Sequence, residues 1–204
     1  MKKTSLAITF ICSSFFFGVK AQDSSRIYFT TSVGLFLPVS KFAAAYKNSL
    51  ALNSGIEYKL NRNYFTQLVL DFNAVKYDQQ FKDNNSNYLF QRTNSSVFLA
   101  GINIGRNIII THSGDFFISP YLGIGYANIG EPRLTVNNNT GIIQQQVTRM
   151  EGVFTREGLR SGYSTKSKIL QTIYLDVSYW AADINVQQSR VMALSLLIGT
   201  RIGF

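Results

Sequence analysis

The last fourteen residues, 191–204, are the feature that most constrains how this chain can fold. An extended strand points successive side chains to opposite faces. The apolar side chains of this run share one face, and they are Met192, Leu194, Leu196, Ile198, Ile202 and Phe204. The opposite face carries Ser195, Gly199, Arg201 and Gly203, which are small or charged. A strand that meets lipid on one side and a narrow interior on the other has this pattern, so the run predicts the terminal strand of a membrane β-barrel.

Further segments of alternating hydrophobicity precede this run, separated by short and long polar connections in turn. The expected strands are 27–37, 50–60, 64–77, 95–106, 116–129, 148–163 and 169–180. Segment 148–163 shows no convincing alternation, and we infer it because the chain needs a strand there to return to the side on which it began. An even number of antiparallel strands is typical of such barrels. The sequence therefore predicts an all-β fold, an eight-stranded antiparallel up-and-down transmembrane β-barrel.

The first residues read as an export signal rather than as part of the barrel. Lys2 and Lys3 precede an apolar stretch, 6–19, and small residues follow it. The stretch is shorter than the roughly 20 apolar residues that span a bilayer as a helix. We therefore expect residues 1–22 to be a cleaved secretory signal peptide and residues 23–204 to be the outer-membrane β-barrel domain.

Composition limits the chemistry that remains after cleavage. The one cysteine, Cys12, leaves with the signal, so disulfide and thiol chemistry are excluded. Residues 23–204 keep 17 basic and 11 acidic side chains, which gives a net charge of +6. A basic protein outside the inner membrane meets anionic lipid headgroups and lipopolysaccharide, so we expect these partners and no nucleic acid.

Five charged residues fall at positions that the alternation places inside the barrel: Glu57, Lys59, Asp71, Asp176 and Arg201. Eight strands leave room only for side chains or one small ligand, and buried charges must be paired. One interpretation is a static salt-bridge network that fills the lumen. The other is a gated polar path in which Arg201 with Glu57 or Asp71 acts as a latch. Alternate glycines at 123 and 125 predict a roomy interior beside them.

An enzyme is the second class that the residues allow us to weigh. His112 is the single histidine, and it lies in an expected short turn, 111–115. A catalytic base is expected at the outer rim of such a barrel rather than in that turn. Asp78 and Asp83 are a weak candidate for calcium, but their spacing matches no calcium-loop pattern. We therefore expect no enzymatic activity, no metal site and no cofactor.

Four short patterns resemble those of a known family. They are Val33 to Pro38, Gly55 to Asn61, Pro120 to Tyr126 and Ile198 to Phe204. With these patterns the chain resembles small outer-membrane β-barrel proteins, the porin-family and PorT-like group, akin to OmpX and OmpW. The resemblance implies a bacterial outer-membrane location and insertion by the barrel-assembly machinery, which recognises a terminal strand ending in an aromatic residue. On this basis Leu196, Ile198, Ile202 and Phe204 are the expected assembly signal.

Two functions stay open at this level. The first is a structural barrel, or a narrow solute or ion pathway through a polar lumen filled by side chains. The alternative is a barrel anchor whose extracellular loops, 78–93 and 130–148, bind a partner protein or surface ligand, including a component of a secretion apparatus. A soluble lipocalin-like barrel would need polar outer faces, and the apolar outward sets argue against it.

Overall fold

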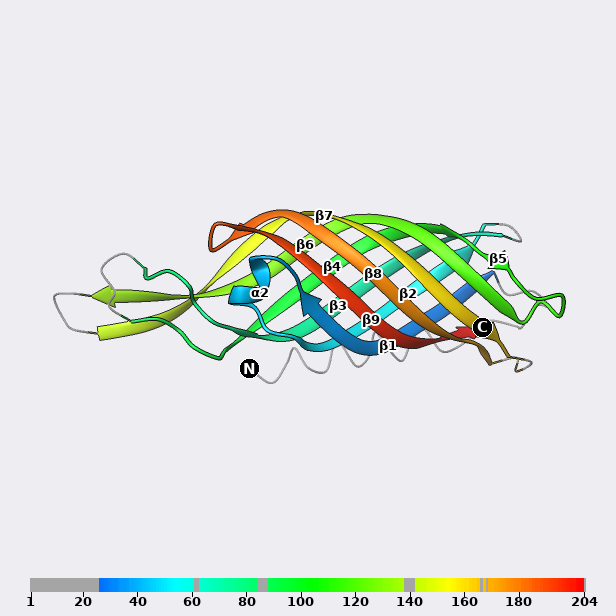
Figure 1. The fold of residues 1–204 in the computed structure, drawn as a ribbon, viewed down its shortest axis with the longest axis horizontal. Coiled ribbons are helices and arrows are strands. Elements are labelled where there is room, and N and C mark those ends of the chain that lie inside the picture. The colour runs from blue at the N-terminus through cyan, green and yellow to red at the C-terminus, as the bar shows by residue number, and fades with distance from the viewer. Residues whose placement is uncertain are drawn as a thin grey trace, which may run out of the picture.

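The chain forms one closed antiparallel β-barrel (Figure 1). The computed structural model describes residues 26–60, 63–83, 88–137, 142–165, 167 and 169–203. Sequential strands are neighbours, and the sheet closes through the β1–β9 and β4–β6 pairings. The eight-stranded fold expected from the sequence is confirmed. The expected signal peptide, Leu6 to Val19 included, lies outside the described residues.

Eight long strands and one short one make up the sheet in the described part of the chain. They are β1 (Ile27–Pro38), β2 (Ser49–Lys59), β3 (Tyr64–Tyr77), β4 (Thr93–Arg106), β5 (Ile108–Ile109), β6 (Phe116–Asn137), β7 (Ile142–Ser164), β8 (Leu170–Val186) and β9 (Ser189–Gly203). β5 continues β4 beyond Asn107 and pairs with β6, as β4 does. The barrel therefore has eight strand positions around its circumference, and β4 and β5 together occupy one of them.

The two ends of the barrel differ. β1 begins and β9 ends at the end of the barrel that also holds the connections from β2 to β3, from β5 to β6 and from β7 to β8, and we call this the terminal end. The opposite end, the loop end, holds the connections after β1, β3, β6 and β8. At the loop end the chain forms a short helix, α2 (Phe42–Ala45), although the sequence pattern indicates no helix there. Among the described residues, no helix is long and apolar enough to cross a membrane.

The expected polar connection 130–148 is shorter than the sequence indicates, because most of it extends two neighbouring strands as a hairpin. β6 runs to Asn137 and β7 begins at Ile142, and the two pair from Asn137–Ile142 down to Phe116–Tyr163. The resulting hairpin projects past the ends of the other strands at the left of Figure 1. Both faces of a strand that leaves the membrane meet water, so polar residues occur on both faces and the alternation is lost.

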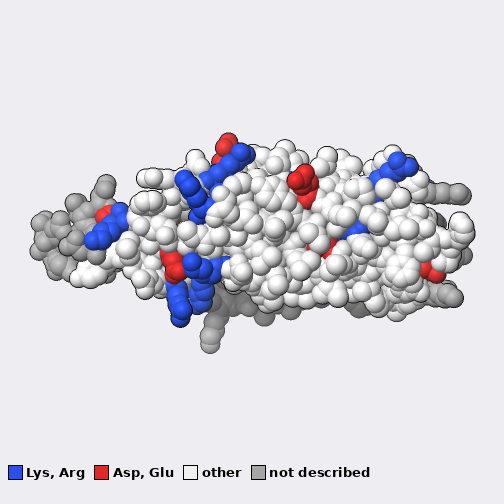
Figure 2. Space-filling view, viewed as in Figure 1, with Lys and Arg blue, Asp and Glu red and all other residues white. Residues whose placement is uncertain are grey.

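The outward face is apolar through the middle of each wall. Leu35, Leu52, Leu68, Ile102 and Leu122 are exposed, as the alternation predicts. On the face seen in Figure 2, the middle of the barrel is largely uncharged, and Lys and Arg gather towards the loop end. Large apolar side chains on a soluble protein would be buried, so this band fits the hydrocarbon of a bilayer.

The roomy interior expected near residues 123 and 125 is absent, because Asn103 fills the space beside Gly123 and Phe154 fills the space beside Gly125. Aromatic rings pair with inward-facing glycines across neighbouring strands, and the pairs are Phe65–Gly105, Phe117–Gly162, Tyr121–Gly158, Tyr174–Gly199 and Phe154–Gly125. A Cβ atom built on Gly158 would lie 2.3 Å from the Tyr121 ring. Because these glycines have no Cβ atom, rings from the neighbouring strands can pack directly against their backbone.

Candidate functional site

The candidate site is the barrel lumen together with the cluster that covers its loop end. Along β8, from the terminal end to the loop end, the inward side chains change from charged to apolar and then to polar. Asp176 lies before Trp180, Ala182 and Ile184 on this strand, and Gln187 lies in the turn beyond. The lumen therefore has three layers.

Arg160 of β7 is the centre of the charged layer. Its Nη1 donates to Glu57 Oε2 at 2.9 Å, its Nε donates to Asp176 Oδ2 at 3.2 Å, and its Nη2 donates to Gln67 Oε1 at 3.1 Å. The guanidinium also lies over the Tyr174 ring, 4.4 Å from its centroid. Because Arg160 is only 2% exposed, these contacts replace the water that a buried charge gives up.

The carboxylates of Glu57 and Asp176 each contact one further side chain. Arg201 Nη2 lies 2.8 Å from Glu57 Oε1, as an ion pair whose angle is not that of an aligned hydrogen bond. The Tyr121 hydroxyl donates to Asp176 Oδ1 at 2.7 Å. A hydroxyl and two guanidinium groups thus satisfy both acids within one layer.

A second pair lies nearer the loop end. Arg156 of β7 forms a buried ion pair with Asp71 of β3, across the lumen. Asn53 donates to the other oxygen of Asp71 and accepts from Ser32 at 3.3 Å. The two clusters together contain three carboxylates and three guanidinium groups, so their formal charges balance.

The structure brings four of the five sequence-predicted lumen residues into this layer. Glu57, Asp71, Asp176 and Arg201 are buried inside the barrel, and Arg201 faces Glu57 rather than Asp71. Lys59 is the last residue of β2 and is only partly buried, and it joins none of the ion pairs found among the described residues. Its place at the terminal end gives its ammonium group access to water.

Sequence reasoning missed the two central arginines, Arg156 and Arg160. Both lie on β7, whose sequence shows no convincing alternation of apolar and polar residues. The side chains do alternate between the two faces, but polar residues interrupt the apolar outward set. The inward set is Phe154, Arg156, Gly158, Arg160 and Gly162, and the outward set is Val153, Thr155, Glu157, Leu159 and Ser161. The sequence signal is the spacing of two residues between Arg156, Gly158, Arg160 and Gly162, which places arginines and glycines on one face of a strand.

An apolar layer separates the charged layer from the loop end. Phe36, Phe154 and Trp180 form its centre, with ring centroids 5.9 Å apart for Phe36–Trp180 and 6.2 Å for Phe154–Trp180. All three side chains are fully buried, and they belong to one cluster with Phe42 of α2 and Leu99 of β4. The layer leaves the lumen without a continuous polar lining.

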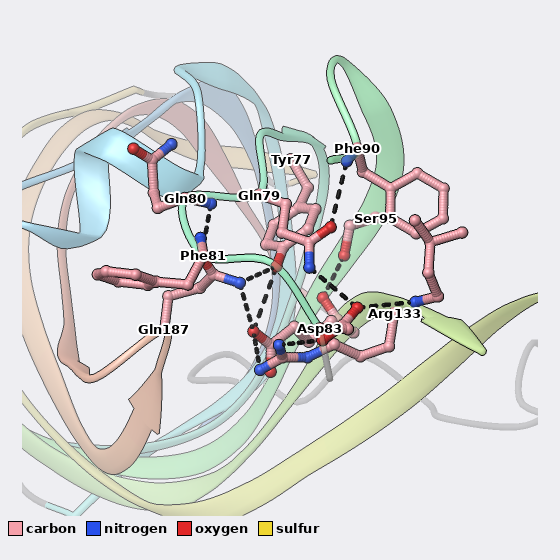
Figure 3. Close-up of polar contacts among 12 residues, drawn as sticks. Tyr77, Gln79, Gln80, Phe81, Asp83, Phe90, Ser95, Arg133 and Gln187 are labelled. Carbon is pink, nitrogen blue, oxygen red and sulfur yellow. Dashed lines mark hydrogen bonds and ion pairs between the residues drawn. The ribbon is translucent and has the colours of Figure 1, made fainter. Parts of the chain in front are cut away.

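Above this layer, a polar cluster covers the loop end (Figure 3). Arg133 of β6 pairs with Asp83 at 2.7 Å and with Glu131 at 2.8 Å. Gln187, in the β8–β9 turn, donates to the Tyr77 hydroxyl at 2.5 Å and to Glu131 at 3.2 Å. Its carbonyl oxygen accepts from the backbone of Gln80 at 2.6 Å. These contacts join the β3–β4 connection, the β6–β7 hairpin and the β8–β9 turn at the loop end of the barrel.

Two acids of the loop after β3, Asp78 and Asp83, have lowered pKa values. Burial by itself would raise the pKa of Asp83, but hydrogen bonds from the Leu134 amide, Arg133 and Gln79 outweigh it and lower that pKa. A hydrogen bond from the Arg92 amide lowers the pKa of Asp78, and Lys47 lowers it further. The hydrogen bonds and ion pairs that hold this loop therefore favour the charged form of both acids.

The residues considered for catalysis and metal binding lie apart. His112 is exposed in the turn between β5 and β6 at the terminal end. Asp78 and Asp83 point to different partners, Arg92 with Lys47 and Arg133 with Gln79. Among the described residues, no three His, Cys, Asp or Glu side chains come together as a metal site.

The fold is similar to solved outer-membrane barrels. Neisserial surface protein A is 13% identical over 90% of this chain and 100% of its own, with a TM-score of 0.52. The N-terminal β-barrel domain of Pseudomonas aeruginosa OprF is 12% identical over 87% and 98%, with a TM-score of 0.49. Ail of Yersinia pestis, solved with the heparin analogue sucrose octasulfate, is 13% identical over 88% and 99%, with a TM-score of 0.44. At such identities the likeness establishes the fold alone.

No protein-family model matches the chain, and no curated protein matches its sequence significantly. The fold therefore carries the assignment of class. The closed sheet, the apolar outer band and the charged lumen define a small eight-stranded β-barrel of the outer-membrane type.

Proposed function

We propose that this protein is an outer-membrane anchor that displays a structured surface to a partner outside the cell. The apolar layer of Phe36, Phe154 and Trp180 carries the proposal, because it closes the lumen between the charged layer and the loop-end cluster. A path for ions or polar solutes needs continuous polar lining or water, and desolvating an ion in such a layer is costly.

The displayed surface consists of the described parts of the β6–β7 hairpin and of the connection between β3 and β4, residues 78–83 and 88–92. Asp83 of the loop accepts from Arg133 Nη1 at 2.7 Å and from the backbone amide of Leu134 at 2.9 Å, both on the hairpin. Gln187 fixes the same loop from the other side through the amides of Gln80 and Phe81. Groups that these contacts already hold in place lose less conformational entropy when a partner binds, so the free-energy cost of association is lower.

The proposal places the terminal end in the periplasm and the loop end outside the cell. Outer-membrane lipids and lipopolysaccharide surround the apolar band. The barrel-assembly machinery inserts the chain and recognises the strand that carries Leu196, Ile198, Ile202 and Phe204. The proposal assigns no catalysis to the barrel.

Site-directed labelling tests the orientation. Since the proposed mature chain has no cysteine, a single cysteine can be placed at Gln145 on the hairpin or at Ser113 in the β5–β6 turn, both exposed. A membrane-impermeant maleimide added to intact cells should label Gln145→Cys. The matched Ser113→Cys variant should react only after the outer membrane is permeabilised. The reverse pattern would overturn the proposed display.

Planar-bilayer conductance tests the closed lumen. The purified barrel should be silent while its heat-modifiable mobility on a gel shows that it is folded. A Phe36→Ser, Trp180→Ser double variant removes two of the three central rings of the apolar layer. It should conduct, and that result would show that the assay detects an open lumen. Reproducible conductance of the unmodified barrel that changes in a Glu57→Gln, Asp71→Asn variant would instead assign a charge-selective pathway.

A further inference from the structure

Glu157 of β7 lies on the outer wall of the barrel, where every neighbouring strand presents apolar groups. Its side chain is exposed, and its cross-strand partners are Leu122 on β6 and Tyr179 on β8. Leu122 is 68% exposed and Leu159, the next outward residue of β7, is 49% exposed. Glu157 forms no hydrogen bond or ion pair with any other residue that the structure describes.

The position of Glu157 along the strand places it near the middle of the apolar band. It is six residues from Tyr163 at the terminal end and six from Glu151, which accepts from Asn128 at the loop end. Six residues span about 20 Å of strand, or about 14 Å of depth at a tilt near 45°. Because the apolar band of such barrels is about 25 Å tall, Glu151 and Tyr163 lie at the depth of the headgroups while Glu157 meets hydrocarbon.

The outer face of β7 carries two further polar side chains near this carboxylate. Thr155 and Ser161 are exposed and outward on the same strand. Beside Ser161, a shallow groove is lined by Tyr163, Ile173, Leu175 and Ile198, which belong to β7, β8 and β9. A lipid-facing charge destabilises a barrel most at mid-depth, and ionisable groups inside a membrane mark functional positions.

We propose that the outer face of β7 is a contact surface inside the membrane for a different protein, one that presents a Lys or Arg at the depth of Glu157. Charge complementarity selects this partner. A carboxylate removed from water is stabilised by a cation at hydrogen-bond distance. Headgroup phosphates are anionic and lie about half a bilayer away.

A second copy of this chain does not supply the cation. Among the described residues, the exposed outward basic side chains of the barrel lie at its two ends, and they are Lys76, Arg106, Arg149 and Arg190. Two copies packed through β7 would instead bring two Glu157 carboxylates together. This inference concerns the wall of the barrel and is independent of the proposed display by the loops.

Defined transmembrane peptides test the proposal with the folded barrel in lipid vesicles. The probe is a Leu-rich helix with one central Lys, and the matched control has Leu at that position. Energy transfer is measured from a label on Ser113→Cys to the peptide. Association with the Lys peptide should exceed that with the Leu peptide by about tenfold or more, and Glu157→Gln should remove the difference.

Three results would overturn the proposal. Equal association of both peptides would show that charge does not select the partner. A Lys preference that survives in Glu157→Gln would move the site elsewhere. Self-association of the unlabelled barrel that depends on Glu157 would assign the face to a second copy. Heat-modifiable mobility and fluorescence of the single tryptophan, Trp180, verify that each variant is folded.

Discussion

Arg160 on β7 donates a hydrogen bond of 2.9 Å to Glu57 on β2, a residue 103 positions earlier in the chain. The pair crosses the lumen and links walls that are not neighbours in the sheet. Its energetic role follows from burial, since both side chains are at most 3% exposed.

Replacing Arg160 by Leu should destabilise the barrel strongly. The change leaves Glu57 and Asp176 with fewer donors in a dry interior, and breaking a buried pair in this way costs about 3–5 kcal/mol. Urea unfolding in lipid vesicles, followed by Trp180 fluorescence, measures the loss. Arg106→Leu, on the exposed terminal end of β4, is the control and should change the midpoint little.

Enlarging Gly158 should also destabilise the barrel, for a steric reason. A Cβ atom there would come within 2.3 Å of the Tyr121 ring, so Gly158→Val should cost about 1–3 kcal/mol through overpacking. A second change, Tyr121→Ala, should recover part of the stability of Gly158→Val. If the two changes are additive in the unfolding assay, the ring does not rest on that glycine.

Docking of loop 78–92 should be lost in acid. The folded-state pKa of Asp83 and of Asp78 is depressed, so their contribution is fully present above the unfolded value of about 3.9. It falls as the pH drops through the lower folded value. Limited proteolysis of the loop should therefore stay slow at about pH 5 and accelerate below about pH 4. Asp83→Asn should make the loop sensitive already at neutral pH, whereas Asp115→Asn, in the opposite turn, should not.

Glu157→Leu should stabilise the isolated barrel in vesicles. The substitution removes a polar group that faces hydrocarbon, so the urea midpoint should rise. The matched change Glu151→Leu, at the polar end of the same strand, removes a hydrogen bond from Asn128 and should not raise it. A lower midpoint for Glu157→Leu would mean that the carboxylate has a stabilising contact in the bilayer.

Changing both Ile202 and Phe204 to Asp, or deleting Phe204, should block membrane assembly. The substitutions place charge on the apolar face of the terminal strand, which we expect the assembly machinery to read. Cell fractionation should find the protein in the periplasm rather than in the outer membrane. Normal assembly of the variants would contradict the terminal-strand hypothesis.

The outer wall could be predicted because its rule is local. A residue such as Leu35 or Ile198 faces lipid according to its position along its own strand, and period-two alternation reveals this without knowledge of the neighbours. The hairpin beyond the membrane and strand β7 were harder. In the hairpin both faces meet water, and in β7 the outward residues Thr155, Glu157 and Ser161 break the hydrophobic pattern.

The sequence by itself therefore determined the class of fold, the closed antiparallel barrel, and the inward placement of Glu57, Asp71, Asp176 and Arg201. Only the tertiary structure decided which charge meets which, that Arg156 and Arg160 complete the network, and that Phe36, Phe154 and Trp180 seal it. The physical reason is that alternation assigns a side chain to a face. Contacts across the lumen depend instead on the register and stagger of all eight strands, which bring together residues as distant in sequence as Glu57 and Arg160.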